Sequence, residues 1–254
     1  MAWDPAHYLQ HADERGRPFH DLLARVGAED PRTVVDLGCG PGNLTVTLAE
    51  RWPEAGILGL DSSAEMISRA RQLDSSVSWL QADIVGWSPP DPVDVIVSNA
   101  ALQWVEDYVD LLPGLLAHLS PGGWFAMQVP YNHDQPLHRI LRELCAEPEF
   151  APYLRGITRT ALVPGREVGD RLLGLGCSVD VWETTYEHLL TGPDPIFGWI
   201  SATGARPALD ALSGQVKERF IAIYKERLRQ AYPAGPHGTW LSFPRSFVVA
   251  RKPG

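Results

Sequence analysis

The spacing of apolar residues along this chain is typical of strands in some segments and of helices in others. Short apolar runs rich in branched side chains, typical of buried strands, occupy residues 34–37, 55–61, 77–81, 93–97, 124–129, 179–186 and 240–251. Segments with apolar residues at helical spacing lie among them, at 17–26, 43–51, 111–119, 137–146 and 166–175. This alternation predicts an α/β fold with a doubly wound, mostly parallel sheet flanked by helices.

Two long stretches interrupt this pattern. Residues 130–165 are rich in Pro, His, Tyr and charge, and residues 187–238 include an amphipathic helix with Phe220 and Leu228 on one face. We therefore expect a single domain over residues 1–254, with helical cap insertions at about 130–165 and 187–238. Pro244 lies inside the last strand, and because proline cannot donate to a ladder, we expect that strand to break or bulge there.

The first strand leads into the most distinctive segment of the chain. Asp36 lies within the apolar run, and Gly38, Gly40 and Gly42 follow at alternate positions just before a helical segment. Glycine permits positive φ and a close approach of backbone N–H groups to a ligand at a helix N-terminus, where the field favours negative charge. The segment predicts a loop that binds a small, partly anionic ligand.

Three kinds of ligand compete for this loop. A dinucleotide loop of the form Gly-x-Gly-x-x-Gly is not present, because position 43 is Asn, and Pro41 removes a donor that a pyrophosphate would use. A Walker-type phosphate loop needs a lysine, and none is near. A nucleoside with a smaller zwitterionic tail remains, and S-adenosylmethionine fits that description.

Polar residues follow the strands at the edge where a ligand of this kind would bind. Asp36, Asp61, Asp83 and Asn99 lie at or just past the carboxyl ends of the first four predicted strands. Ligands of open parallel sheets bind at that edge. Asp61 falls 19 positions past Gly42, close to the offset at which a carboxylate meets a ribose hydroxyl in nucleoside-binding folds.

The segment 35–42, Val-Asp-Leu-Gly-Cys-Gly-Pro-Gly, closely resembles the first motif of class I S-adenosylmethionine-dependent methyltransferases. The resemblance implies a seven-stranded Rossmann-like sheet whose last strand runs antiparallel. It also implies that Asp36 and the glycine backbone hold the amino-acid tail of the cofactor, that Asp61 binds the ribose, and that Asn99 lies beside the methionine part. The expected cofactor-binding residues are Tyr8, Arg17, Asp36, Gly38, Gly40, Gly42, Asp61, Ser62, Met66, Asp83, Ile84, Asn99 and Leu102.

Three residues ahead of the first strand have two possible interpretations. Tyr8, Arg15 and Arg17 belong to a lead segment and helix that come before the glycine loop. They are either plain surface residues or part of a lid over the ligand.

Further segments extend the resemblance over most of the chain. Residues 3–9, 15–18, 98–104, 184–186, 201–207 and 242–245 together are similar to the trans-aconitate 2-methyltransferase family, whereas residues 132–160 align little. This resemblance implies methyl transfer to a carboxylate oxygen of a small polycarboxylate, giving a monomethyl ester. A carboxylate with a pKa of roughly 4 is already the nucleophile at pH 7, so no general base is required and none is named.

An anionic acceptor needs local positive charge, because the chain has a formal net charge of -9. By resemblance and position we expect the guanidinium groups of Arg206 and Arg245 to bind the substrate, since the planar fork of arginine matches a carboxylate. Alternatively, Arg206 caps a helix and Arg245 pairs with a surface acid. The full set of expected substrate-binding residues is Gln103, Trp104, Tyr186, Trp199, Arg206 and Arg245.

Composition and charge bear on the binding partners, the cellular compartment and the presence of a metal. The net charge of -9 and a pI of about 5.3 argue against partners such as nucleic acid or an anionic membrane. Three scattered cysteines and an N-terminus without a basic-then-apolar pattern favour a cytoplasmic protein, expected as a monomer or weak dimer. His133 and His138 lack cysteine or acid neighbours at zinc-site spacing, so we expect no metal.

Three functional alternatives stay open at this point. The same cofactor could serve another small-molecule or carrier-bound acceptor, and an amine acceptor would require a base. The chain could also be an S-adenosylmethionine-binding module that has lost its chemistry. An NAD-dependent dehydrogenase is the weakest alternative, because the spacing of the third glycine and Pro41 both oppose it.

Overall fold

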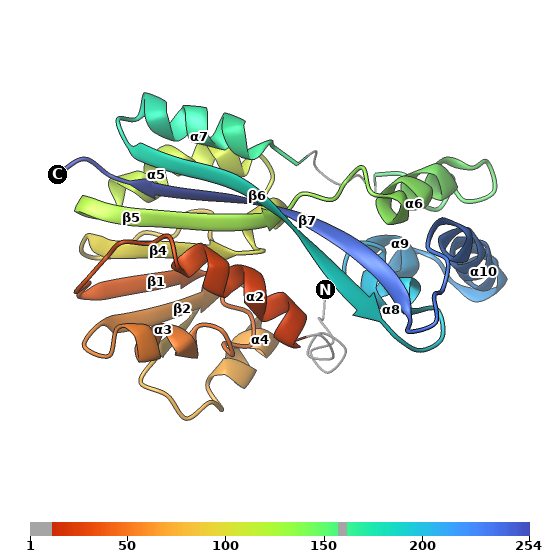
Figure 1. Ribbon diagram of the computed structural model, residues 1–254, viewed down its shortest axis with the longest axis horizontal. Helices are drawn as coiled ribbons and strands as arrows, with labels where there is room; N and C mark the ends of the chain where they lie inside the picture. The colour runs from red at the N-terminus through yellow and green to blue at the C-terminus, as the bar shows by residue number, and fades with distance from the viewer. Residues whose placement is uncertain (1–11, 157–161) are drawn as a thin grey trace. The chain divides into compact units, whose positions relative to one another are not determined.

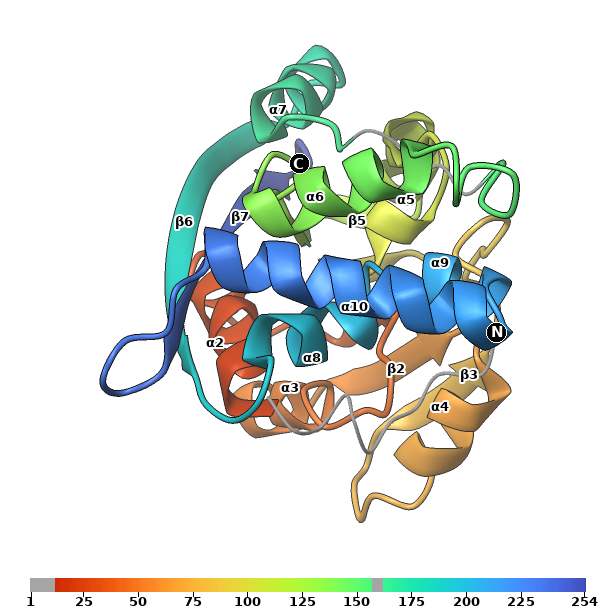
Figure 2. The ribbon, with the colours of Figure 1, turned by 90° about the vertical axis from the view of Figure 1, so that its right-hand side faces the viewer.

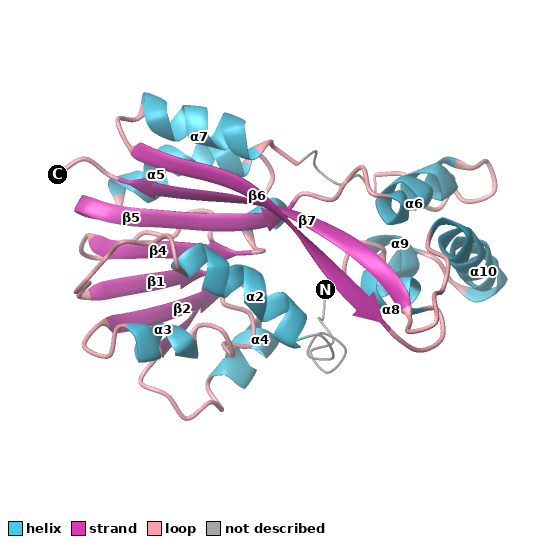
Figure 3. Cartoon of the chain, in the orientation of Figure 1, coloured by secondary structure: helices cyan, strands magenta, loops and turns pink. Residues whose placement is uncertain are grey.

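The predicted alternation of strands and helices is present in the structure. The computed structural model describes residues 12–156 and 162–254 (Figure 1). Within these residues the strands form one seven-stranded sheet in the order β3-β2-β1-β4-β5-β7-β6 (Figure 3). The strands are β1 (Thr33–Leu37), β2 (Gly56–Asp61), β3 (Ser78–Gln81), β4 (Val93–Asn99), β5 (Leu119–Pro130), β6 (Ser178–Leu190) and β7 (Thr239–Arg251).

Helices precede or connect these strands. The α-helices are α2 (Ala12–Leu23), α3 (Val46–Arg51), α4 (Ala64–Ala70), α5 (Leu112–Ala117), α6 (Pro136–Ala146), α7 (Gly165–Gly174), α8 (Pro195–Ser201), α9 (Arg206–Ala211) and α10 (Gly214–Ala231), and the 3₁₀ helices are η1 (Leu102–Trp104) and η2 (Tyr108–Leu111). Local chemistry sets several of their starts. Ser63 caps α4 by accepting a hydrogen bond from the Met66 N–H at 3.3 Å, and a proline begins α6 and α8, where its missing N–H costs nothing.

Strand directions agree with the fold that the resemblance implies. Parallel pairing joins β3, β2, β1, β4 and β5. The last strand, β7, runs antiparallel to β5, with Trp124 opposite Arg251 and Pro130 opposite Arg245. The prediction of a seven-stranded sheet with an antiparallel last strand is confirmed.

The predicted break at Pro244 is wrong. β7 is continuous from Thr239 to Arg251. Proline lacks a donor but keeps its acceptor, and the carbonyl oxygen of Pro244 accepts a hydrogen bond from the Tyr131 N–H at 2.9 Å. A proline is tolerated in a strand where its own N–H is not needed.

The chain divides into two compact units. The described part of the first unit comprises residues 12–130, 162–184 and 245–254, and that of the second comprises residues 131–156 and 185–244. Both insertions predicted from the sequence fall largely in the second unit, and β6 and β7 contribute residues to both.

Branched apolar residues of the central strands form much of the core of the first unit. Val34 on β1 and Val95, Ile96 and Val97 on β4 have no exposed surface. Continuous burial along a strand, rather than alternate burial, is what a parallel sheet covered on both faces produces. The central strands therefore hold the loops at their carboxyl ends on a rigid support.

Helix α10 is the longest element of the second unit and lies beside α6 and α8 (Figure 2). Its Phe220 and Tyr224 side chains are fully buried among residues of those helices. Ion pairs join Lys225 and Arg229 to Asp194, which precedes α8, at 3.2 and 2.7 Å. No described helix is long and apolar enough to cross a membrane.

Candidate active site

The glycine loop is held in place by backbone hydrogen bonds to the end of β2. The N–H groups of Gly38 and Cys39 donate to the Leu60 carbonyl oxygen at 2.7 and 2.9 Å. Gly38, Gly40 and Gly42 all have positive φ, between 56° and 84°. Residues with a β-carbon rarely adopt this conformation, so the three glycines permit the turn.

Glycine is also required at two of these positions because neighbouring side chains leave no room for a β-carbon. A β-carbon on Gly38 would overlap that of Ala101, in the loop after β4. A β-carbon on Gly42 would lie 2.5 Å from Trp79 Cη2, and one on Gly59 in β2 would lie 2.5 Å from Trp79 Cζ3. The indole of Trp79 thus occupies the space that side chains at both positions would need.

Asp36 lies at the base of this loop and is 3 % exposed. Its Oδ2 accepts a hydrogen bond from Thr45 Oγ1 at 2.6 Å. Burial raises the pKa of Asp36 from 3.8 to about 7; the bond from Thr45 opposes the rise, and the charge of Asp61 adds to it. Among the described residues, Asp36 Oδ1 has no hydrogen-bond partner, which is costly for a buried acceptor.

Asp61, at the end of β2, links the glycine loop to the next turn. Its Oδ2 accepts from the Gly40 N–H at 3.0 Å, and its Oδ1 accepts from the Ser63 N–H at 2.8 Å. Each carboxylate oxygen has a second lone pair, so these bonds are compatible with the predicted role in ribose binding.

The residues predicted to contact adenine lie after β3. Asp83 is exposed, and its Oδ1 accepts from the Val85 N–H at 2.9 Å, which forms a tight turn. Ile84 is half-buried, and its Cδ1 lies 3.9 Å from the position of a β-carbon on Gly38. Ser62 is exposed beside Asp61. Asp61, Ser62, Asp83 and Ile84 therefore lie at the same sheet edge as the glycine loop.

Gln128 on β5 supports the turn that follows β4. Ala100 has φ of 55°, a left-handed conformation that costs a non-glycine residue roughly 1–2 kcal/mol. The Ala100 N–H donates to the Gln128 carbonyl oxygen at 2.9 Å, and Gln103 Nε2 donates to the Ala100 carbonyl oxygen at 2.7 Å. Gln128 Nε2 also donates to Asn99 Oδ1. Hydrogen bonds from both sides thus hold the strained turn.

Arg245 lies on β7 and is only 4 % exposed. Its Nη1 donates to Gln128 Oε1 at 3.1 Å, so Arg245 and Asn99 bond to opposite ends of one amide. The alternative in which Arg245 pairs with an acid on the surface is wrong, because the side chain is buried.

The role of four further predicted cofactor residues stays a prediction. Met66 is 5 % exposed, and Leu102 has no exposed surface and belongs to the hydrophobic core. Arg17 is exposed on α2. Tyr8 lies outside the described residues.

The predicted substrate residues divide between the two units. In the first unit, Gln103 supports the Ala100 turn, and Trp104 is 46 % exposed. In the second, Tyr186 and Trp199 are buried, and the Trp199 ring stacks on His188 with centroids 4.9 Å apart. Arg206 begins α9, and its Nε lies 3.5 Å from Asp210 Oδ2 in the same helix. Its role in substrate binding stays a prediction.

The sequence patterns did not identify three polar residues that contact or lie beside the predicted site residues. Thr45 and Gln128 contact Asp36 and Asn99, and His188 lies among the aromatic residues of the second unit. Gln128 carried a recognisable signal, because it interrupts the apolar run 124–129 and yet has no exposed surface. Buried polar side chains of this kind are hydrogen-bonded, so each implies a partner.

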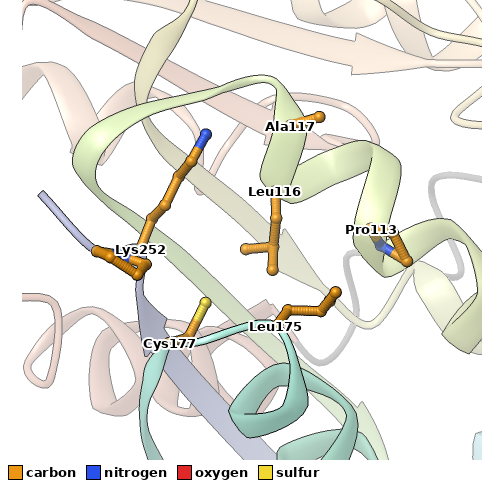
Figure 4. A pocket seen from close by; sticks show the side chains of 7 residues that line it. Pro113, Leu116, Ala117, Leu175, Cys177 and Lys252 are labelled. Carbon is orange, nitrogen blue, oxygen red and sulfur yellow. The ribbon is translucent and has the colours of Figure 1, made fainter.

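A separate pocket of about 260 Å³ lies at the opposite edge of the sheet, where β5 begins (Figure 4). Cys177, Leu116 and Lys252 contribute to its lining, and Lys252 Nζ donates to the Leu119 carbonyl oxygen at 2.6 Å. Burial raises the pKa of the Cys177 thiol, and the charge of Lys252 opposes the rise. The pocket shares none of the predicted site residues.

The residues around the glycine loop fit S-adenosylmethionine. The buried Asp36 supplies an ionisable acceptor whose raised pKa a nearby ammonium would lower. The glycine turn leaves room for close backbone approach, and Asp61 lies beside it. Within residues 12–156 and 162–254 no group of three or more His, Cys, Asp or Glu side chains is arranged to hold a metal ion.

Comparison with known protein families agrees with this geometry. A methyltransferase-domain family model matches residues 34–123, which include the glycine loop and β4. The chain is 48 % identical to the trans-aconitate 2-methyltransferase of Streptomyces coelicolor, over 99 % of this chain and 87 % of that protein. It is 46 % identical to the trans-aconitate 2-methyltransferase of Azoarcus sp., over 98 % of both chains.

Solved structures share the fold at low sequence identity. The YcgJ protein of Bacillus subtilis superposes with a TM-score of 0.60 at 13 % identity, covering 96 % of this chain and 100 % of that one. A mycolic acid cyclopropane synthase, solved with S-adenosylhomocysteine, superposes with a TM-score of 0.58 at 17 % identity, covering 93 % of this chain and 83 % of that one. With the loop geometry and the close relatives together, the chain belongs to the trans-aconitate 2-methyltransferase family of S-adenosylmethionine-dependent methyltransferases.

Proposed function

We propose that this chain transfers the methyl group of S-adenosylmethionine to one carboxylate of trans-aconitate, or of a close polycarboxylate, and so forms a monomethyl ester. The observation that carries the proposal is the identity of 48 and 47 % with two trans-aconitate 2-methyltransferases over 99 % of the chain. The bound cofactor supplies an electrophilic methyl group on a sulfonium, and the chain supplies binding and orientation.

Asp36, the glycine loop, Asp61, Asp83, Ile84 and Asn99 are the residues that we propose hold the cofactor. The orphaned Oδ1 of Asp36 supports this assignment at the amino-acid tail, because a buried acceptor without a partner is stabilised by a donor. Asp61 and the exposed Asp83 offer carboxylate oxygens at the ends of β2 and β3.

Arg245 is the residue in the first unit best suited to a carboxylate of the acceptor. A polyanion that approaches a chain of net charge -9 requires a fixed cation, and the guanidinium of Arg245 remains charged at any physiological pH. A guanidinium has five N–H donors, and Nη1 of Arg245 donates to Gln128 Oε1 at 3.1 Å. Bidentate contact with a carboxylate is compatible with that bond.

Orientation and exclusion of water are sufficient for this reaction. The acceptor carboxylate is ionised at neutral pH, so the chain has no proton to remove before transfer. Holding a nucleophile in line at short distance can lower a barrier by roughly 7–11 kcal/mol. We therefore assign no general base.

The test is a panel of acceptors in a methyl-transfer assay with labelled S-adenosylmethionine. The panel contains trans-aconitate, other di- and tricarboxylates, and small amines and phenols. We expect methylation of carboxylic acids alone, with the highest kcat/KM for trans-aconitate and no loss of rate between pH 6 and 8 through ionisation of the acceptor. Turnover of an amine with a bell-shaped pH profile, or no turnover of any acid, would overturn the proposal.

A further inference from the structure

Asn99, Gln128 and Arg245 form a chain of hydrogen bonds across three neighbouring strands of the first unit. Asn99 lies directly opposite Gln128 in the parallel register of β4 and β5. Gln128 Nε2 donates to Asn99 Oδ1, and Gln128 Oε1 accepts from Arg245 Nη1 at 3.1 Å. Gln128 has no exposed surface, Arg245 is 4 % exposed, and Asn99 is half-buried.

The chemistry of arginine determines the direction of every bond in this chain. A guanidinium has donors and no acceptor, so the end of the Gln128 amide that faces Arg245 must be the oxygen. The NH₂ end must then face Asn99, which has to offer its own oxygen in return. The orientation of both amides is therefore set by the cation.

The same residue also fixes the backbone at this point. The carbonyl oxygen of Gln128 accepts from the N–H of Ala100, whose φ of 55° is left-handed. Main chain and side chain of Gln128 thus act together on two consecutive residues, Asn99 and Ala100, at the carboxyl end of β4. With its oxygen turned toward Gln128, Asn99 directs its Nδ2 donors away from Gln128.

We propose that Gln128 is a positioning residue that transmits the donor character of Arg245 to Asn99, so that Asn99 presents its NH₂ group to the carboxylate of the methionine part of the cofactor. This inference rests on the proposed function for the identity of the cofactor and on Arg245 as the acceptor-binding cation. It gives one buried amide a contact with both halves of the reaction.

The central test replaces Gln128 by glutamate and measures binding of S-adenosylhomocysteine by calorimetry. Gln128→Glu keeps the shape of the side chain and strengthens the contact with Arg245, because the bond becomes charge-assisted. It removes the donor to Asn99, whose amide must rotate and present oxygen to the ligand carboxylate. We expect at least tenfold weaker binding of S-adenosylhomocysteine, with a melting temperature equal to or above that of the unchanged protein.

A second set of variants separates positioning from general damage to the sheet. Asn99→Ala should weaken binding by a similar factor, and adding Gln128→Glu to it should cost nothing more, because Gln128 acts through Asn99. Asn99→Asp, which keeps the acceptor for Gln128 and removes the donor, should reproduce the loss even if Gln128→Glu does not fold. Asp94→Asn serves as the control, since Asp94 accepts backbone N–H bonds from Arg32 and Thr33 at the other end of the strands, and should lower stability without changing affinity.

Three results would overturn the proposal. The first is affinity for S-adenosylhomocysteine within twofold of the unchanged protein in Gln128→Glu or Asn99→Asp. The second is an equal further loss when Gln128→Glu is added to Asn99→Ala. The third is a fall in melting temperature that accounts for the loss of binding. Because these titrations contain no acceptor, they give an answer even if trans-aconitate is not methylated.

Discussion

Raising the pH from 5 to 8 should destabilise the ligand-free protein through one carboxyl group, Asp36. Burial raises its pKa from 3.8 to about 7, against the hydrogen bond from Thr45 and with the charge of Asp61. The folded protein therefore holds this proton more tightly than the unfolded chain does. The stability from Asp36 is fully present below the unfolded pKa and is lost as the pH rises through the folded pKa.

The magnitude follows from the shift of the pKa. At 1.36 kcal/mol per pKa unit, a rise from 3.8 to about 7 corresponds to about 4 kcal/mol over the whole window. Roughly 3 kcal/mol of this falls between pH 5 and pH 7, where the unfolded chain is ionised and the folded protein is not. Above pH 7 both states are ionised and no further loss is expected.

The assay is urea unfolding of the ligand-free protein and of Asp36→Asn at pH 5 and pH 8. Asparagine keeps an oxygen that accepts from Thr45 Oγ1 but cannot ionise, so the difference between the two proteins isolates the carboxyl group. Between pH 5 and pH 8 we expect the free energy of unfolding to fall by about 3 kcal/mol more in the unchanged protein than in Asp36→Asn. Equal losses in both proteins would refute the reasoning.

Asp94 offers a control of opposite sign. Burial would raise its pKa, but hydrogen bonds from the Arg32 N–H, the Ser120 side chain and the Thr33 N–H hold the pKa below its usual value. Its contribution is fully present above the unfolded pKa, which lies below both pH values. Asp94→Asn should therefore lower stability by the same amount at pH 5 and pH 8.

Three further predictions follow from the site. Binding of S-adenosylhomocysteine at pH 7 should release about half a proton, because Asp36 with a pKa of about 7 is half protonated there and the ligand ammonium favours its ionised form. Calorimetry in two buffers of different ionisation enthalpy measures the release, and release that persists in Asp36→Asn would point to another group. Gly42→Ala should lower the free energy of unfolding in urea by about 2 kcal/mol or more, since positive φ and Trp79 both oppose a β-carbon. Gly40→Ala should lower it by about 1 kcal/mol, because a β-carbon at position 40 would have no other atom within 4 Å. Equal losses would mean that Trp79 yields. Arg245→Lys should raise KM for the acid about tenfold and leave affinity for S-adenosylhomocysteine within twofold, because an ammonium still donates to Gln128 but lacks the planar fork. If the affinity for S-adenosylhomocysteine falls as well, Arg245 contributes to cofactor binding or to the fold.

Strand positions were predictable from the sequence because burial and branching coincide in a parallel sheet. The run around Val95 predicts β4 within two residues of its observed end. The start of α3 was less predictable: the pattern suggests residue 43, but the helix begins at Val46. The Thr45 hydroxyl bonds to Asp36 instead of capping the helix, and local sequence gives no sign of that longer-range partner.

Side-chain direction set the limit on predicting the site. Asp36, Asp61 and Asn99 lie at the expected sheet edge because strand ends determine their place, whereas the burial of Met66 and Leu102 was not predictable from their positions in the sequence. Gln128 could be flagged as a polar residue within an apolar strand. Its partners could not be named, because Asn99 lies 29 positions and Arg245 lies 117 positions away, and only the sheet register brings them together.

The most direct test of the account is the fate of a trideuterated methyl group supplied on S-adenosylmethionine together with trans-aconitate. We predict that mass spectrometry of the product shows one labelled methyl group on each acid molecule, and that mild alkaline hydrolysis releases it as labelled methanol and regenerates the acid. Binding of S-adenosylhomocysteine without any transfer to the acid, or a label that survives hydrolysis, would contradict carboxylate O-methylation.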